Sequence, residues 1–314
     1  MAKIAVVAVG GNSLIKDSAH QSIPDQYQAV VETAGHIADM VEAGWEVVVT
    51  HGNGPQVGFI LLRSELSRGK VHPVPLDVIG ADTQGAIGYH LQQALGNEFR
   101  RRGMNKLAVT VVTQAVVDRD DPAFQKPSKP IGPFMTEAEA RQREQEEGWD
   151  VVEDAGRGWR RVVASPKPHC IVELDCIKTM IEAGFVVIAV GGGGIPVVPA
   201  PGGSLEGVAA VIDKDLASSL LARNLHADLF VISTAVEKVC LRFGTPQQES
   251  LDRVTLEQAR AYLTEGHFKA GSMKPKVEAV IAYLQEDGPA ALITNPENLR
   301  RALNGETGTH FVRA

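Results

Sequence analysis

Continuous apolar runs alternate along the chain with longer amphipathic segments. Residues 4–9 form a β-branched run that ends at Gly10-Gly11-Asn12, which is typical of a buried strand leading into a tight loop. Pro24 opens a helical pattern that stops at Gly44, and residues 45–50 predict the next strand. The chain is therefore expected to begin with a strand, a helix and a second buried strand.

The same order of elements recurs 140 residues later in the chain. Residues 40–55 contain a helix end, a glycine, an apolar run and a glycine loop, and residues 180–196 repeat them with Gly191–Gly194 as the loop. Further apolar runs at 107–112 and 229–233 predict more strands. Strands that are apolar on both faces and alternate with helices indicate an α/β fold, in which helices cover both sides of a parallel sheet.

Residues 118–167 interrupt this alternation with a polar, charged segment. Within it, residues 137–147 predict an exposed helix, and residues 149–163 predict a small polar hairpin. An insertion of this size is more often a lid or a dimer element than a loose loop, so we expect it to project from the main sheet.

Composition and charge exclude several classes of protein. The 314 residues carry 31 Lys and Arg against 38 Asp and Glu, a formal net charge of −7 that gives no general attraction to nucleic acid or an anionic membrane. Cys170, Cys176 and Cys240 match neither a disulfide framework nor a zinc site. The apolar runs are too short for a signal peptide or a membrane span, so we expect a cytoplasmic protein.

The glycine loops after the strands favour an anionic ligand. Glycine lets backbone N–H groups approach an oxyanion, and a following helix adds its positive end. The dinucleotide-binding fingerprint is absent, because the first loop is Gly10-Gly11-Asn12-Ser13 and the second strand ends in Thr50-His51 rather than in an acidic residue. The Walker loop and the protein-kinase motifs are absent too. A phosphotransferase with this sequence therefore belongs to another class.

Three lysines are candidates for binding a polyanion. Lys129 is followed directly by Pro130 and lies two residues after Pro127, so its backbone is stiff. Lys214 and Lys276 lie at predicted helix starts, where a cation is unfavourable to the helix dipole. A bound polyanion would offset that cost.

Seven motifs, in order along essentially the whole chain, resemble those of the carbamate kinases in the amino acid kinase superfamily. They are residues 10–12 (GGN), 50–57 (THGNGPQV), 129–133 (KPIGP), 191–194 (GGGG), 213–215 (DKD), 234–239 (TAVEKV) and 271–276 (GSMKPK). The first motif, DKD and the late lysine are shared with the wider superfamily. Residues 50–57 and 129–133 are the specific part of the resemblance.

The resemblance implies reversible phosphoryl transfer between ATP and carbamate, giving ADP and carbamoyl phosphate, with Mg²⁺ carried by the nucleotide phosphates. The expected direction is ATP synthesis in the catabolism of arginine, citrulline or purine-derived carbamoyl phosphate. It also implies a three-layer αβα sandwich around a mainly parallel sheet, as a single catalytic domain over 1–314, and a homodimer. Residues 118–167 would be the protruding subdomain, about 1–205 the acceptor lobe and 206–314 the nucleotide lobe.

The site residues follow by position from the same resemblance. Carbamate and the transferring phosphoryl group would be bound by Gly10, Gly11, Asn12, Gly52, Asn53, Gly192 and Gly193. The catalytic residues would be Lys129, Lys214, Asp215 and Lys276. The nucleotide would contact Lys214, Asp215, Thr234, Val236, Val239, Met273 and Lys276, with Asp215 near the magnesium. Carbamate is already an anion, so no general base is assigned, and His51 is expected to shape its loop.

Two positions depart from the family pattern: Lys274 replaces a small residue, and Cys240 replaces a common aromatic. Both bear on nucleotide binding. Two alternatives remain, a superfamily kinase for another small carboxylate and a catalytically silent nucleotide-binding paralogue. The insertion with Lys129 favours the carbamate enzymes over the first, and the retained Lys214, Asp215 and Lys276 speak against the second.

Overall fold

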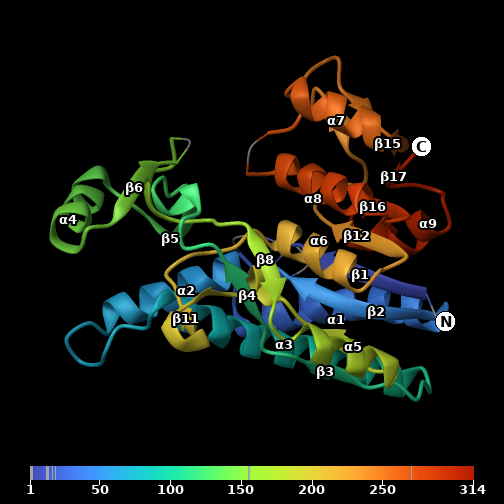
Figure 1. Ribbon diagram of the computed structural model, residues 1–314, viewed down its shortest axis with the longest axis horizontal. Coiled ribbons are helices and arrows are strands. Elements are labelled where there is room, and N and C mark those ends of the chain that lie inside the picture. The colour runs from blue at the N-terminus through green and yellow to red at the C-terminus, as the bar shows by residue number, and fades with distance from the viewer. Residues whose placement is uncertain (1–2, 12–13, 16, 18, 155, 270) are drawn as a thin grey trace.

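A central sheet of eight strands organises the computed structural model, which describes residues 3–11, 14–15, 17, 19–154, 156–269 and 271–314 (Figure 1). The strand order is β15-β17-β16-β12-β1-β2-β9-β3. The strands are β1 (Lys3–Val9), β2 (Trp45–His51), β3 (Ala108–Thr110), β9 (Val186–Ile188), β12 (Leu229–Ser233), β15 (Arg253–Thr255), β16 (Ala290–Thr294) and β17 (Thr309–Val312). From β3 to β16 neighbouring strands are parallel, and β17 runs antiparallel to β16. The predicted mainly parallel sheet is confirmed.

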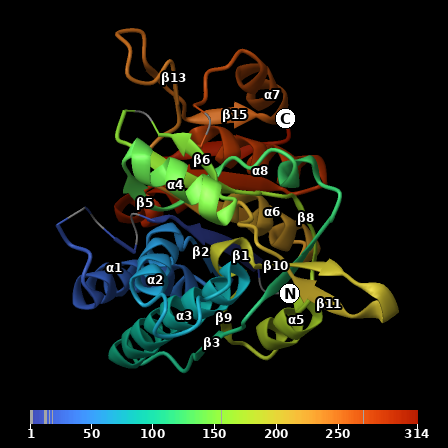
Figure 2. The ribbon, with the colours of Figure 1, turned by 90° about the vertical axis from the view of Figure 1, so that its left-hand side faces the viewer.

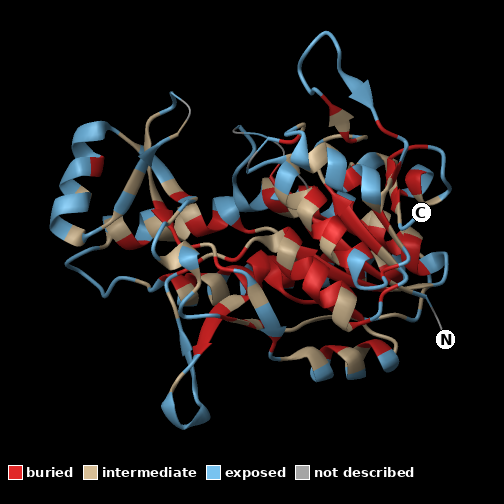
Figure 3. Ribbon diagram, turned by 45° about the horizontal axis from the view of Figure 1, so that its top comes forward, coloured by how far each residue is buried: buried red, intermediate tan, exposed pale blue. Residues whose placement is uncertain are grey.

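Helices cover both faces of this sheet because its central strands are apolar on both sides. In β1, Ala5, Val7 and Val9 pack toward α1 (Ile23–Glu42), α3 (Leu76–Arg101) and α9 (Leu299–Leu303). Val6 and Ala8 pack into the opposite core, with α5 (Leu174–Glu182), α6 (Lys214–Asn224), α7 (Leu256–Thr264) and α8 (Met273–Gln285). Figure 3 shows the sheet strands buried between these helices. The three-layer αβα arrangement is therefore confirmed.

A second sheet lies beside the first, with the strand order β11-β10-β4-β8. Its strands are β4 (Gln114–Val117), β8 (Pro168–Ile171), β10 (Ile195–Pro199) and β11 (Leu205–Gly207). The sequence pattern did not predict this sheet. The short strands β13 (Cys240–Leu241) and β14 (Glu249–Ser250) form a separate antiparallel pair, and 3₁₀ turns occur at Pro122–Phe124, Gly191–Gly193, Pro201–Gly203 and Pro296–Asn298.

Between β4 and β8 the chain forms a small unit that stands away from the large sheet in Figure 1 and faces the viewer in Figure 2. It contains β5 (Lys129–Met135), α4 (Glu137–Glu147), β6 (Asp150–Glu153) and β7 (Trp159–Val163), with the strand order β5-β7-β6. The predicted helix and hairpin are both present. A small apolar cluster that includes Val57, Ile131 and Val163 joins this unit to α2 (Gly54–Leu66). The exact limits of the subdomain and the division into two lobes stay predictions.

Among the helices of the described residues, none combines the length and the hydropathy that a membrane span requires.

Candidate active site

The loops after β1 and β2 meet at the carboxyl edge of the sheet. The Gly10 N–H donates to the carbonyl of Ser233 at 3.0 Å, and the Gly52 N–H donates to the carbonyl of Val9 at 3.0 Å. A Cβ on Gly10 would lie 2.7 Å from the Ser233 oxygen, so this close approach requires glycine. Gly11 and Gly52 are then left facing a large cavity.

The glycine turn after β9 packs against the loop after β2. Gly192 and Gly193 have φ values of +67° and +99°, a region that favours glycine. A Cβ on Gly191 would clash with the imidazole of His51, and one on Gly192 would clash with the amide of Asn53. The two predicted loops are therefore in direct contact, which places Gly192 and Asn53 on one wall of the cavity.

Asn53 is held by a chain of hydrogen bonds from α3. Its Nδ2 donates to Oγ1 of Thr83 at 2.8 Å, and the Thr83 hydroxyl donates to the carbonyl of Gly80 at 2.8 Å. Because Asn53 is buried, this chain fixes which side of its amide faces the cavity.

Gln84, one residue further along α3, braces the glycine turn. Its Nε2 donates to the carbonyl of Gly191 at 2.9 Å and to that of Thr113 at 3.1 Å, and its Oε1 accepts from the Thr113 N–H at 2.7 Å. The side chain is 1% exposed, so all of these hydrogen bonds are shielded from solvent. Gln84 therefore couples α3 to the turn that carries Gly192.

We expect Gln84→Ala to lower the free energy of unfolding by about 3 kcal/mol, because it leaves buried backbone groups of Thr113 and Gly191 without partners. Urea unfolding measures the change. Gln93→Ala is the matched control on the same helix, because Gln93 is exposed and contacts only Tyr89 through its amide among the described residues. Equal stability of the two variants would contradict the bracing role.

His51 is buried beside this turn and is held neutral. Its Nδ1 lies 3.0 Å from the carbonyl of Gly52, and the side chain is 1% exposed. Burial, assisted by the nearby positive charge of Lys214, lowers the pKa of His51 from 6.5 to about 4. A neutral, enclosed imidazole supports the predicted loop-shaping role.

This pKa predicts how His51 titrates. Between pH 6.5 and pH 4 the unfolded chain binds a proton at His51 that the folded chain does not, so the free energy of unfolding falls as the pH falls, by up to about 3 kcal/mol. Histidine side-chain ¹⁵N shifts, assigned with His51→Gln, measure the titration directly. We expect His51 to stay neutral from about pH 8 to pH 5. A midpoint near the ordinary value of about 6.5 would contradict the assignment.

Asp213 caps α6 and also holds Lys129. One carboxylate oxygen accepts from the Asp215 N–H at 2.9 Å, and the other lies 2.9 Å from Nζ of Lys129. Lys129 begins β5, so this ion pair brings a cation of the insertion to the start of α6. The sequence motif contained Asp213 without indicating this contact.

Lys214, Asp215 and Lys276 form a charge cluster at the starts of α6 and α8, in which Asp215 is buried and the two lysines are half-buried. The two carboxylate oxygens of Asp215 lie 2.9 Å from Nζ of Lys214 and 2.8 Å from Nζ of Lys276. Nζ of Lys214 also donates to the carbonyl of Val9 at 3.3 Å, beside the first glycine loop. The cluster therefore connects both helices to the end of β1.

The electrostatics of this cluster keep Asp215 ionised. Burial alone raises the pKa of Asp215, but the ammonium groups of Lys214 and Lys276 outweigh it and lower the pKa to about 2. Burial lowers the pKa of Lys214, Asp215 raises it, and the like charge of Lys276 lowers it further. Two cations around one carboxylate leave a net positive charge that faces the cavity.

We call this cavity, of about 740 Å³, the lysine cavity. Its described lining includes the predicted residues Gly11, Gly52, Asn53, Lys129, Gly192, Lys214, Asp215 and Lys276. Gly10 and Gly193 are outside that lining, and a Cβ on Gly193 would lie 2.6 Å from the carbonyl of Ile212, which indicates a packing role. Asn12 lies outside the described residues.

A smaller side cavity of about 330 Å³ shares Ser272 with the lysine cavity. Val236, Met273 and Cys240 are among its lining residues. Val239 is instead buried in the core, and Thr234 is half-buried with its N–H bonded to the carbonyl of Thr294 at 2.8 Å. Within the described lining, neither of them borders the side cavity, and their assignment to the nucleotide stays a prediction.

Two further basic residues, Lys274 and Arg160, differ in their relation to the cavities, and Lys274 is the departure from the family pattern that bears on nucleotide binding. Lys274 is 47% exposed, lies 3.9 Å from Glu278, and is outside the described lining of both cavities. Arg160, from β7, lines the lysine cavity and contacts Asp154 at 3.3 Å. Arg160 belongs to no motif, and the hairpin pattern alone did not show which of its residues face the cavity.

The described residues contain no cluster of three or more His, Cys, Asp or Glu side chains that could hold a metal ion. Asp215 is the predicted magnesium neighbour, and both of its oxygens are in contact with lysine ammonium groups. The donor set therefore fits a metal that arrives bound to a phosphate ligand better than a resident metal site.

Comparisons with known proteins agree with this architecture. A family model described as the amino acid kinase family matches residues 3–295. The carbamate kinase-like protein YahI of Escherichia coli is 52% identical, with 100% of each chain covered. The carbamate kinase of Pyrococcus furiosus is 49% identical, with 99% of this chain and 100% of the relative covered.

Among solved structures, carbamate kinase from Giardia lamblia bound to AMP-PNP superposes with a TM-score of 0.94 at 42% identity, covering 100% of this chain and 99% of that chain. The fold that the sequence motifs predict is thereby confirmed. The chain belongs to the amino acid kinase family and, within it, to the group of the carbamate kinases.

Proposed function

We propose that this enzyme transfers a phosphoryl group reversibly between ATP and carbamate, giving ADP and carbamoyl phosphate. The observation that carries the proposal is the convergence of Lys129, Lys214 and Lys276 on one cavity, beside glycine turns whose backbone approaches the same space. Phosphoryl transfer needs positioning and charge neutralisation more than covalent help from the protein. Three ammonium groups and a glycine-lined wall supply both.

In the direction of ATP consumption, a carbamate oxygen attacks the γ-phosphorus. A new P–O bond forms to carbamate, the bond to the bridging oxygen breaks, and ADP leaves with that electron pair. The reverse step transfers the phosphoryl group from carbamoyl phosphate to ADP. The attacking oxygen is already anionic in either direction, so no proton has to be removed, and His51 is uncharged and enclosed. We therefore assign no general base.

Each charged residue has a proposed role in this step. Lys129 contacts the carbamate or the phosphoryl group in transit, and Lys214 and Lys276 lie along the γ-phosphate and the bridging oxygen. Asp215 orients the two lysines, because its oxygens contact both ammonium groups. Preorganised cations in a cavity with little water stabilise transition-state charge far more than they would in bulk water.

Magnesium enters as part of the nucleotide substrate in this proposal. It would neutralise phosphate charge and hold the phosphate chain in one conformation. Asp215 is the carboxylate that would lie near this magnesium, and the nucleotide oxygens would be its ligands. The side cavity, with Val236 and Met273, is the proposed position of the nucleoside.

Direction, localisation and assembly are separate parts of the proposal. We propose net ATP formation from carbamoyl phosphate in arginine, citrulline or purine-derived catabolism, in the cytoplasm, by a homodimer. The three cysteines are unpaired with one another, which agrees with a reducing compartment.

We expect Lys129→Met to raise the KM for carbamoyl phosphate by about tenfold or more, because it removes the cation that the insertion brings to the cavity. Steady-state rates at saturating MgADP measure the effect. Lys126→Met is the matched control, since Lys126 is exposed in the same loop and lies outside the described lining. Equal KM values for the two variants would remove Lys129 from the acceptor site.

The proposed function is tested by following ATP formation from carbamoyl phosphate and MgADP, with acetyl phosphate as the control donor. We expect turnover with carbamoyl phosphate and little with acetyl phosphate. Preferential use of another acyl phosphate would indicate a different small-carboxylate acceptor. ADP binding without turnover on any donor would indicate a silent nucleotide-binding paralogue.

A further inference from the structure

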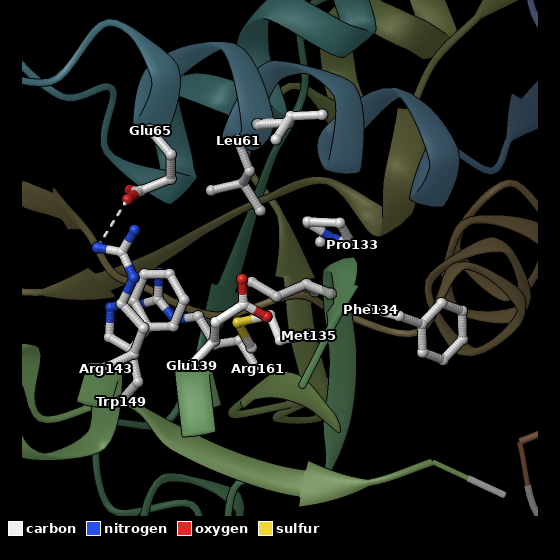
Figure 4. Close-up of a pocket in the computed structure, with 12 residues that line it drawn as sticks. Leu61, Glu65, Pro133, Phe134, Met135, Glu139, Arg143, Trp149 and Arg161 are labelled. Carbon is white, nitrogen blue, oxygen red and sulfur yellow. Dashed lines mark ion pairs between the residues drawn. The ribbon is translucent and has the colours of Figure 1, made fainter. Parts of the chain in front are cut away.

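A separate pocket of about 300 Å³ lies where the insertion packs against α2. We call it the insertion pocket. Leu61 points into it from α2, and Met135, Glu139 and Arg161 gather on the opposite wall (Figure 4). Its described lining does not include Lys129, Lys214 or Lys276. The proposed phosphoryl transfer therefore does not use this pocket.

Most of the charge around the insertion pocket is already compensated. The Glu65 carboxylate lies 3.1 Å from Arg143 and 2.9 Å from Arg68, and Glu147 pairs with the same two arginines. The Glu139 carboxylate accepts from the backbone N–H and the hydroxyl of Thr136, at 2.8 and 2.7 Å, as part of the cap of α4. Glu65 and Glu147 are therefore neutralised by the two arginines, whereas Glu139 keeps its negative charge and is held by the helix cap.

Arg161 differs from Arg143, the other arginine in the described lining of this pocket, which pairs with Glu65 and Glu147. In the part of the chain that the structure describes, the guanidinium of Arg161 has no carboxylate within ion-pair distance and donates no hydrogen bond. Burial lowers its pKa, and the carboxylates of Glu147 and Glu65 only partly oppose that effect. A half-buried cation without a partner is costly, and a bound anion would offset that cost.

The packing of Arg161 leaves its donors available. The guanidinium lies over the indole of Trp149, 4.6 Å from the ring centroid. Stacking on an aromatic ring uses the face of the guanidinium and keeps its edge N–H groups free. A planar edge with parallel N–H groups matches a carboxylate, which it binds through two hydrogen bonds.

We propose that the insertion pocket binds a small monocarboxylate with an apolar body. The carboxylate pairs with Arg161, and the apolar body packs against Leu61, Pro133 and Met135. A phosphate dianion fits less well, because Glu65 and Glu139 also line the pocket. A cationic ligand fits less well too, because Glu65 is already paired with two arginines and Arg161 would repel a cation.

A ligand in this pocket would rest on the strand that bears Lys129. Residues 131–134 of β5 line both the insertion pocket and the lysine cavity. The binding experiment must therefore distinguish the two cavities. The experiment measures ligand binding and not turnover, so its outcome does not depend on whether carbamate is the phosphoryl acceptor.

The test is isothermal titration of 3-phenylpropionate into the full chain with MgADP present, with 3-phenylpropan-1-ol as the uncharged analogue. We expect saturable binding of the acid, and binding of the alcohol weaker by about tenfold or more. The substitution Arg161→Gln should weaken binding of the acid by a similar factor. Arg141→Gln is the matched control, because Arg141 also stacks on an indole, that of Trp159, but pairs with Glu144 and lies outside the described lining.

Two further variants make the result independent of the folding of Arg161→Gln. Leu61→Trp fills the pocket while it keeps Arg161, and it should abolish binding. Lys214→Met alters the lysine cavity and should leave binding unchanged. The proposal is overturned if the acid does not bind, if the alcohol binds equally well, if Leu61→Trp binds normally, or if Lys214→Met loses binding.

Discussion

Lys214→Met is expected to lower kcat by about a hundredfold to a thousandfold, with the fold intact. The ammonium group of Lys214 is buried, and it lies 2.9 Å from Asp215 and 3.3 Å from the carbonyl of Val9. Removing one fixed donor from a site that stabilises developing charge typically costs this much in rate. Methionine replaces the aliphatic part of the lysine side chain without its ammonium group, and Asp215 keeps Lys276 as its partner. The loss should therefore appear in turnover rather than in folding.

Steady-state kinetics and urea unfolding on the same preparations measure both effects. Lys274→Met is the matched control, since Lys274 also lies at the start of α8 but contacts Glu278 and is exposed. We expect its kcat to remain close to that of the unmodified chain. Unchanged turnover in Lys214→Met would remove Lys214 from the mechanism.

Asp215→Asn is expected to lower kcat by about a hundredfold or more and the free energy of unfolding by about 3 kcal/mol. The substitution keeps the shape of the side chain but leaves two half-buried ammonium groups without this counter-charge. Because Asp215 raises the pKa of Lys214, its removal lowers that pKa further. If the ammonium form of Lys214 is the active one, turnover falls as the pH rises through this pKa. The alkaline limb of the pH–rate profile should then move to lower pH.

This shift separates an electrostatic role from a merely structural one. A variant that is only less stable would lose activity at every pH without moving the limb. Asp287→Asn is the control, because Asp287 is 85% exposed and pairs with Arg313 at the surface. An alkaline limb at the same pH in Asp215→Asn and in the unmodified chain would contradict the proposed control of Lys214 by Asp215.

The sequence predicted the layered fold because the central strands are apolar on both faces. Residues 4–9 showed this pattern, and in the structure alternate side chains of β1 enter two different cores. The glycine loops after the strands could also be located, since parallel strands end at one edge of the sheet. The sheet of β4, β8, β10 and β11 was not predicted, because its strands are short and lack clear alternation.

The sequence also located the charged centre of the site but not its supports. Lys214 and Asp215 were recognisable because they occur in a motif at a helix start. Thr83 and Gln84 occupy an ordinary helical stretch, where polar residues usually face solvent, and only the folded arrangement brings them against Asn53 and Gly191. The contact between Lys129 and Asp213 joins residues 84 positions apart, which no local pattern indicates.

The proposed mechanism also separates two kinds of glycine in the motifs. Gly11, Gly52 and Gly192 line the lysine cavity, so their backbone can approach a ligand. Gly10 and Gly193 are required because neighbouring carbonyls leave no room for a Cβ. The sequence motifs cannot distinguish the two kinds, because the residue is glycine in both. Packing alone distinguishes these cases, and Gly192 belongs to both, because it lines the cavity and a Cβ there would also clash with Asn53.

The most direct test of the central claim is ³¹P NMR of carbamoyl phosphate and MgADP during turnover, with the unmodified chain and Lys214→Met compared at saturating nucleotide. The account predicts that the unmodified chain converts carbamoyl phosphate and ADP to ATP one for one, and that Lys214→Met does so at least about a hundredfold more slowly. Release of inorganic phosphate in place of ATP, or equal rates for the two proteins, would contradict phosphoryl transfer by this lysine cluster.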